Sequence, residues 1–255
     1  MRDSVLAAMQ YGLKKQKMLE KSKGQFFLYA FLGGMFVAFG VLLYLSIGAP
    51  FVAAGSPGAK LAMGAAFPLA ICLIIFAGGD LFTGNTMAFT IALLEKETTF
   101  KDTLKVWLFS YFGNITGCIV TVFIYVKSKI PSDQLIQYIN DTAAHKIHVD
   151  FFPLFLRALL CNTLICLLIW AAVRMQTEIG KIAVFFFCIL GMIGIGLEHS
   201  IANSATLSLS YFLDGGNSLG SILYSMATVT LGNIIGGCFC VGLPYWFLGK
   251  KDKVK

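Results

Sequence analysis

The sequence interrupts two long apolar stretches with the same polar pattern. Asp80 stands five residues before Asn85 in the first stretch, and Glu198 stands five residues before Asn203 in the second, an offset of 118 residues. Matching Gly-Asn-Ile-x-Gly segments follow in both halves, with an offset of 119 residues. This nearly constant spacing predicts a duplicated unit. Paired polar interruptions in the two halves of a membrane protein point to a transport site, so we expect a channel or a transporter.

The composition is that of a protein embedded in lipid. Apolar residues make up 57% of the chain and charged residues only 13%, and the mean hydropathy is +0.78. These values are too apolar for a soluble chain of 255 residues. We expect an all-α fold in the lipid bilayer whose six spans are each long enough to cross a core of about 30 Å. The second and fifth of these contain the interruptions and are expected to be broken helices: 25–48, 60–94, 104–126, 151–173, 182–209 and 217–248.

The duplication places three spans in each half. An odd number of spans forces the second copy into the membrane upside down, which gives an inverted 3+3 repeat. The first residues carry apolar positions on one side and lysines on the other, as an amphipathic surface helix does. We expect this helix at 1–24, a membrane domain at 25–248 and a basic tail at 249–255. Within the membrane domain, a long polar external loop at 127–150 separates the two repeats, which lie at 25–126 and 151–248.

The distribution of charge predicts the orientation. The net charge is +7, and the segments 1–24, 95–105, 174–181 and 249–255 hold 15 of the 20 Lys and Arg residues. Cytoplasmic loops of membrane proteins carry such an excess. We therefore expect a multi-pass plasma-membrane protein with both termini in the cytoplasm. Basic membrane flanks explain the positive charge, so we expect no nucleic-acid partner.

The sequence offers no metal or cofactor site. All seven cysteines fall inside predicted spans, and none stands at metal-ligand spacing from a histidine, so we expect free thiols that pack among apolar neighbours. The chain has no Gly-rich loop ending in Lys-Ser/Thr that would bind nucleotide phosphates. Transport is therefore expected to be passive or coupled to protons.

Two residues at the interruptions are the leading candidates for the centre of a pore. His199 is the only histidine within a predicted span, and its imidazole can offer a passing anion a hydrogen bond or a proton. Thr83 brings a hydroxyl to the other interruption, beside glycines whose backbone N–H groups could also face an anion. Asp80 and Glu198 would repel an anion, so we expect them to cap a broken helix or bond the loop.

Three asparagines are expected to support the interruptions. Asn162 is expected to hold Glu198 or His199 in position. Asn114 and Asn233 are expected to satisfy loose backbone groups near the breaks, because each lies in one of the matched Gly-Asn-Ile-x-Gly segments.

Charged and apolar residues flank this polar centre. Lys146 lies just outside the fourth span, where a lysine would raise the local anion concentration at a pore mouth. Apolar side chains beside the interruptions could form constrictions that remove water from the permeant species. The candidates for such constrictions are Phe67, Ile71, Leu81, Phe82 and Met192.

At these residues the chain resembles the formate/nitrite transporter family. The resemblance implies an aquaporin-like homopentamer with one pore in each protomer, which passes small monovalent anions such as formate, nitrite, lactate or hydrosulfide. The matching stretches run in order through essentially the whole chain, and the last is highly specific: Gly79-Asp80-Leu81-Phe82-Thr83, His145-Lys146-Ile147-His148, Cys161-Asn162-Thr163-Leu164-Ile165-Cys166 and Gly196-Leu197-Glu198-His199-Ser200-Ile201-Ala202-Asn203.

The resemblance also implies roles for single residues. Thr83 and His199 would face each other across a central chamber, and Lys146 would draw anions in. Phe67 and Met192 would form the outer constriction. The inner constriction would consist of Ile71, Leu81 and Phe82. The methionine at the outer constriction and the Ser-Ala-Thr after Ile-Ala-Asn differ from the family's formate channels and make the chain look closer to the hydrosulfide-conducting branch.

Two other classes of function stay open. A neutral-solute channel of the water/glycerol kind would share the six-span inverted repeat, although this chain lacks the paired Asn-Pro-Ala turns of those proteins. An intramembrane enzyme would use His199 with Glu198 or Asp80, but adjacent residues point to different helix faces and no His-Glu-x-x-His motif is present. We expect instead that an anion meets His199 and crosses the apolar slits close to neutral, because an unpaired charge there is very costly.

Overall fold

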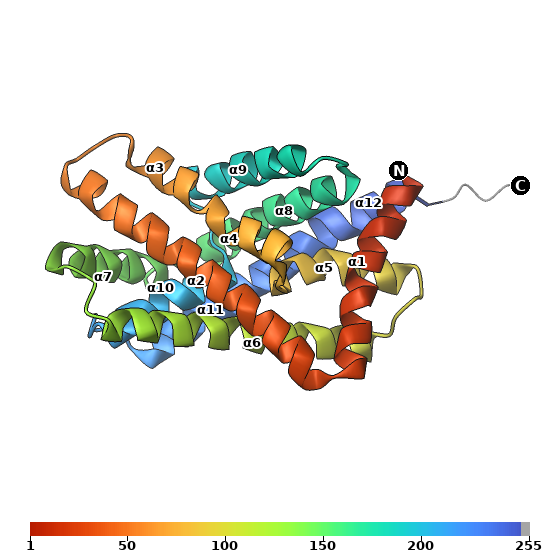
Figure 1. Cartoon of the computed structure of the whole chain (residues 1–255), viewed down its shortest axis with the longest axis horizontal. Coiled ribbons are helices and arrows are strands. Elements are labelled where there is room, and N and C mark those ends of the chain that lie inside the picture. Colours follow the sequence, from red (N-terminus) through yellow and green to blue (C-terminus); the bar gives the residue numbers. More distant parts are fainter. Residues whose placement is uncertain (251–255) are drawn as a thin grey trace, which may run out of the picture.

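The computed structural model describes residues 1–250, and the regular elements in that range are helical, as predicted (Figure 1). The predicted basic tail at 249–255 lies outside the described residues, except for its first two positions. The chain runs through these elements in order: α1 (Arg2–Lys21), α2 (Lys23–Ala53), α3 (Ala59–Ala66), α4 (Pro68–Cys72), the π-helical turn η1 (Leu73–Gly78), α5 (Phe82–Leu94), α6 (Phe100–Lys127), α7 (Asp133–Ile147), α8 (Phe151–Arg174), α9 (Glu178–Gly194), α10 (Ser200–Phe212), α11 (Leu219–Ile235), the π-helical turn η2 (Gly236–Gly242) and α12 (Leu243–Leu248).

Five helical segments of the described range are long and apolar enough to cross a bilayer. In the remaining predicted span, at 182–209, the apolar stretch is divided between α9 with 17 residues and α10 with 13. Each is shorter than the roughly 20 residues of a continuous crossing, so the sixth crossing stays a prediction. The five segments are Lys23–Ala53, Ala59–Gly78, Phe100–Lys127, Phe151–Arg174 and Leu219–Leu248.

The helix is interrupted at both places where the sequence carries its polar pattern. η1 ends at Gly78 and α9 at Gly194, while α5 and α10 begin only after short non-helical stretches. Gly78 has a φ of +94° and Gly196 a φ of +76°, a left-handed conformation that glycine adopts without strain. The same bond closes both preceding helices: Gly79 N–H donates to the Ile74 carbonyl at 3.0 Å, and Leu197 N–H donates to the Met192 carbonyl at 3.0 Å.

Close backbone contact joins long helices within each half. A β carbon on Gly117 of α6 would collide with the carbonyl of Phe31 on α2. A β carbon on Gly236 would collide in the same way with the carbonyl of Leu159 on α8. These glycines allow helix backbones to touch, which brings the asparagines of the same segments within reach of the interruptions.

The segment between the two halves, expected to be a polar loop at 127–150, is instead largely the helix α7. The Ser132 hydroxyl oxygen caps its start by accepting a hydrogen bond from the Leu135 N–H at 3.3 Å. Every fourth residue from Leu135 to Ile147 is buried. That spacing is an amphipathic-helix signal, which the polar composition of the segment obscured.

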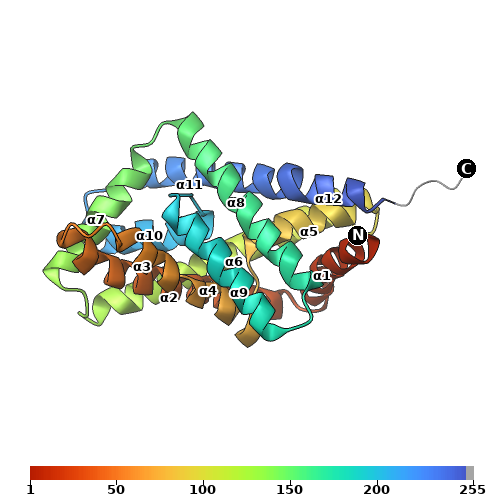
Figure 2. The same cartoon turned by 90° about the horizontal axis from the view of Figure 1, so that it is seen from above.

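The two amphipathic helices lie at opposite ends of the molecule. In both views α1, the connection between α5 and α6 and the end of α12 lie toward one end, and α7 and the connection between α2 and α3 lie toward the other (Figures 1 and 2). The predicted cytoplasmic segments around α1 and α12 therefore share one end, as a common side of the membrane requires. Which side of the membrane that end faces stays a prediction.

Candidate pore centre

His199 and Thr83 meet in the middle of the molecule, although 116 residues separate them in sequence. Thr83 Oγ1 lies 3.0 Å from His199 Nε2, and both side chains are buried. His199 is also the N-cap of α10, where its Nδ1 accepts a hydrogen bond from the Ala202 N–H at 3.2 Å. In a neutral imidazole, a nitrogen that accepts leaves the proton on the other nitrogen. The geometry therefore assigns Nε2–H as the donor to the Thr83 hydroxyl.

Asn114 fixes the first interruption. Its Oδ1 accepts a hydrogen bond from the N–H of Phe82, the first residue of α5, at 2.9 Å. Its Nδ2 donates to the carbonyls of Ala30 at 2.7 Å and Asp80 at 2.8 Å. One buried side chain thus satisfies two backbone groups that the broken helix leaves without partners, those of Phe82 and Asp80, and ties them to α2 through Ala30.

Asn233 does the same at the second interruption. Its Oδ1 accepts from the N–H of Ser200, the first residue of α10, at 2.8 Å. Its Nδ2 donates to the carbonyls of Ala158 at 2.7 Å and Glu198 at 3.1 Å. The bonds around Asn114 and Asn233 match one for one, which is what a duplicated unit leads one to expect.

Asp80 is held by a buried ion pair with a residue that sequence reasoning missed. Lys15 of α1 places Nζ 2.6 Å from Asp80 Oδ1 and also donates to Asn85 Oδ1 at 2.6 Å. Asn85 Nδ2 and the Ser110 hydroxyl donate to the same carboxylate. Burial is the largest single influence and lowers the pKa of the Lys15 ammonium, but the Asp80 carboxylate and the Tyr11 hydroxyl together raise it by more, so this pKa lies above its usual value. Lys15 is therefore a charged partner at the first interruption.

Glu198 has the equivalent arrangement with a lysine from α7. Lys146 Nζ donates to Glu198 Oε2 at 2.7 Å, and Asn203 Nδ2 donates to the same oxygen at 2.8 Å. Lys146 was expected at a pore mouth as a cation that draws anions in. In the structure its side chain is 15% exposed and bound to a carboxylate, which leaves only part of its charge available to solvent.

Asn162 has different partners from those expected. It contacts neither Glu198 nor His199 by hydrogen bond. Its Nδ2 instead donates to the Thr83 carbonyl at 3.2 Å, the Thr86 hydroxyl at 3.0 Å and the Asn233 carbonyl at 2.6 Å. Asn162 therefore positions the start of α5 and ties it to α11. Its neighbour on α8, Cys166, also lies 3.5 Å from the Thr83 carbonyl, and all seven cysteines of the chain are free thiols.

A small apolar cavity adjoins His199. Its volume is about 20 Å³, room for about one water molecule. Four of the five residues expected to form constrictions line this one cavity together with His199: Phe67, Ile71, Leu81 and Met192. The structure thus brings both expected constrictions to the same space. Sequence reasoning missed Ile74 of η1 and Ile189 of α9, which also line it.

Phe82 is placed elsewhere. Its ring is not among the residues that line the cavity, and it packs edge to face against Tyr111 with ring centres 5.0 Å apart. It also packs against Trp107 at 6.2 Å. Phe82 therefore belongs to an aromatic cluster with α6, and a place in the inner constriction stays a prediction.

The sequence model described as "Formate/nitrite transporter" matches residues 2–247. The chain belongs to the formate/nitrite transporter family. It is 34% identical over 242 residues to the uncharacterized transporter YwcJ of Bacillus subtilis, covering 94% of each chain. It is also 32% identical over 231 residues to the nitrite transporter NirC of Escherichia coli, covering 89% of this chain and 84% of that one. The family predicted from the motifs is thereby confirmed.

Solved structures of other proteins share the architecture of this chain. An "FNT family ion channel" superposes with a TM-score of 0.90 at 28% identity, covering 97% of this chain and 99% of the other. A "pentameric formate channel with formate bound" superposes with a TM-score of 0.77 at 27% identity, covering 90% and 98%. The chain is therefore a multi-pass membrane protein of the formate/nitrite transporter fold. Its relatives here are named as transporters and channels, which assigns it to transport rather than to catalysis.

Proposed function

We propose that the protein conducts small monovalent anions of weak acids, such as formate, nitrite or hydrosulfide, through a pore in each protomer of a plasma-membrane homopentamer. Its relatives support the substrate class, since they include a nitrite transporter and a probable formate transporter of Methanothermobacter thermautotrophicus. A pentameric formate channel of the same fold supports the assembly. The hydrosulfide preference rests on the motif differences alone.

The meeting of two helix N-termini beside an apolar cavity carries this proposal. α5 and α10 both begin at the middle of the molecule and run toward opposite ends, and the bond between Thr83 and His199 joins their first turns (Figures 1 and 2). A helix N-terminus carries about +0.5 of an elementary charge. Half-helix N-termini at the membrane midplane attract anionic groups without adding a fixed charge. The centre therefore favours an anion over a cation.

The hydrogen bonds of His199 favour a role as hydrogen-bond donor at the pore centre over a role as the source of a proton for the anion. Nδ1 accepts from the Ala202 N–H, so a second proton on the ring would face that N–H and remove the cap of α10. Nε2–H donates to Thr83, which leaves the Thr83 hydroxyl hydrogen free to bond an anion. The proton that neutralises the weak acid then comes from solvent.

The ion pairs on either side of the centre allow anions to approach it. Asp80 and Glu198 would repel an anion if they were unpaired, but Lys15 and Lys146 each neutralise one of them at 2.6 and 2.7 Å. Each interruption then carries no net charge from its acid–lysine pair. The positive helix termini remain as the uncompensated field at the centre.

Flux into proteoliposomes tests the proposal. Formate, nitrite and hydrosulfide would be compared across pH for the native chain, for His199→Asn, and for His148→Asn as an exposed matched control. We expect anion flux that rises as the pH falls. Asn can still cap α10, so His199→Asn should fold. Its shorter side chain does not place a donor at the Thr83 hydroxyl, so the flux should fall about tenfold while the pH dependence is kept.

Three outcomes would overturn parts of this proposal. Flux of His199→Asn that no longer responds to pH would show that His199 supplies the proton. Absence of anion flux together with rapid water or glycerol flux would contradict anion transport and favour a neutral-solute channel. Equal effects of the two histidine substitutions would remove the special role of His199.

A further inference from the structure

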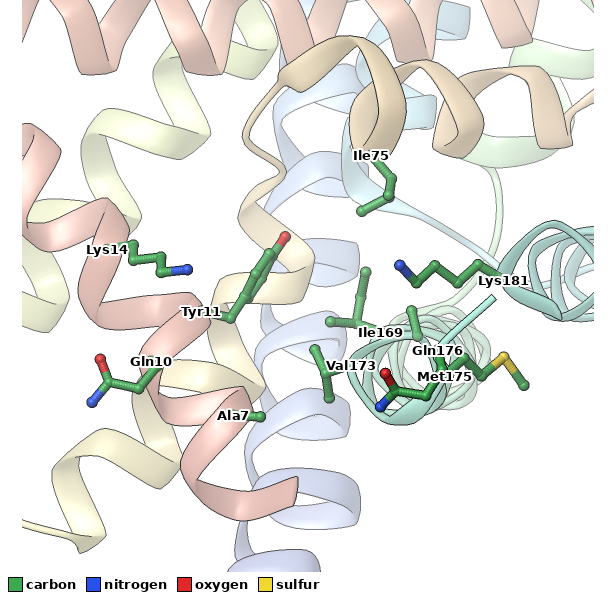
Figure 3. A pocket seen from close by; sticks show the side chains of 11 residues that line it. Ala7, Gln10, Tyr11, Lys14, Ile75, Ile169, Val173, Met175, Gln176 and Lys181 are labelled. Atoms are coloured by element: carbon green, nitrogen blue, oxygen red, sulfur yellow. The ribbon is translucent and has the colours of Figure 1, made fainter. Parts of the chain in front are cut away.

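A second, larger cavity lies at the α1 end of the molecule, outside the pore centre. Its volume is about 480 Å³, and its walls come from α1, η1, the C-terminal part of α8 and the start of α9. Lys14 and Lys181 project toward it from opposite walls, and the Tyr11 hydroxyl lies between them (Figure 3). Gln176 adds an amide group.

This cavity adjoins the small one beside His199 along two helical elements. Ile165 of α8 lines the small cavity, and Ile169, one helical turn further, lines the large one. On η1, Ile74 lines the small cavity and the next residue, Ile75, lines the large one. The large cavity therefore adjoins the pore centre on the α1 side, where the mouth of the proposed pore would lie.

The charge of the two lysines is largely uncompensated. Lys14 has no carboxylate within 4 Å among residues 1–250. In the same range Lys181 has one such partner, Glu178 at 3.7 Å, whose own side chain is 66% exposed and well hydrated. Apolar side chains of Ile75, Ile169 and Val173 line the same cavity as the two ammonium groups.

We propose that this mouth binds a small organic dicarboxylate, with one carboxylate at Lys14 and the other at Lys181, and that the bound dicarboxylate blocks the pore from the α1 end. Two cations on opposite walls, with apolar side chains between them, fit two carboxylates joined by a short carbon chain better than one compact anion. The blocking step rests on the proposed function, whereas the binding step does not.

The dicarboxylate is a blocker and not a cargo. The cavity beside His199 holds about 20 Å³ against about 480 Å³ at the mouth. An anion that bridges the two lysines is too large for the inner cavity. It would also carry two charges into apolar surroundings, which is more costly than moving one.

Calorimetry on the full-length protein in detergent tests the binding step. Succinate is the probe, and its monoamide succinamate has the same size with one charge fewer. We expect succinate to bind more tightly than succinamate, and Lys14→Gln and Lys181→Gln each to weaken succinate binding about fivefold. Lys17→Gln removes the same charge from α1 outside the cavity and should leave binding unchanged.

Formate efflux from proteoliposomes tests the blocking step. Succinate on the α1 side should inhibit formate flux, and succinate on the α7 side should not. Equal affinity for succinate and succinamate, or native affinity in the Lys14→Gln/Lys181→Gln variant, would overturn the binding site. Binding without inhibition would overturn the block. Absence of formate flux before any succinate is added would contradict the proposed function and leave the calorimetric result standing.

Discussion

Replacing Lys15 by methionine removes one partner of the buried ion pair that holds α1 against the first interruption. The Lys15 and Asp80 side chains are 6% and 0% exposed, and Nζ lies 2.6 Å from Oδ1. Methionine keeps most of the apolar stem and removes the charge. Asp80 then keeps only the neutral donors Asn85 and Ser110. Removal of one partner of a buried pair costs about 3–5 kcal/mol, and we expect a loss of unfolding free energy in that range.

A double-mutant cycle separates the pair from the two single effects. In Lys15→Met/Asp80→Asn neither charge remains, so the loss should fall short of the sum of the single losses by about 2 kcal/mol or more. Lys146 and Glu198 form the matched pair at the second interruption. Their side chains are more exposed, at 15% and 9%, and solvent screening should reduce their coupling to about 1 kcal/mol.

Equilibrium unfolding in mixed micelles measures both cycles. Trp246 is a suitable fluorescent reporter, since its Nε1 donates at 2.8 Å to Glu95, which also binds Arg2 of α1. Limited proteolysis would report separately whether α1 detaches. Strictly additive losses for Lys15→Met and Asp80→Asn would refute the argument that the ion pair fixes α1 to the interruption.

Three further predictions follow from the same geometry. Asn233→Ala leaves the buried N–H of Ser200 without its acceptor, and we expect a loss of about 2–3 kcal/mol in the same unfolding assay; a loss near zero would contradict the capping role. Gly78→Ala forces a β carbon onto a φ of +94° and should cost about 1 kcal/mol, whereas Gly24→Ala meets no atom within 4 Å and should not destabilise; equal stability of the two variants would exclude strain at the break. The hydrogen bond from Arg2 holds the pKa of the Glu95 carboxyl below its usual value of 4.5, so the pair stabilises α1 above that pH and loses its effect as the pH falls through the lowered pKa. Hydrogen exchange of α1 should show this acid-dependent loosening in the native chain, and persistence of the same response in Glu95→Gln would assign it to another group.

Hydropathy and internal repetition predicted much of this fold because both are local or periodic properties. The positions of the apolar helices and of the two interruptions follow from runs of residues that lipid requires to be apolar. The roles of Asn114 and Asn233 could be anticipated because they recur at one offset. α7 was missed although its buried residues recur every four positions, since its polar composition suggested a loop.

The contacts that sequence did not predict depend on how distant segments pack. The acids Asp80 and Glu198 are 118 residues apart, which is the offset of the repeat. Their partners Lys15 and Lys146 are 131 residues apart, so a comparison of the two halves at the repeat offset does not match the lysines with each other. Asn162 was expected to hold Glu198 or His199 in position. It bonds instead to Thr83, a contact across the halves that no local pattern encodes.

The bonds around each interruption also set an order in which the protein can assemble as it is synthesised. Asn114 closes the first interruption on Ala30 and Asp80, so every residue in that set has been synthesised before Ala158, the earliest partner of Asn233, is added. Domains fold from the N-terminus as the chain emerges. The first half can therefore lock its broken helix while the second is still being inserted. The contact between Thr83 and His199 then forms as a docking step between two prepared halves, and the pore centre is completed last.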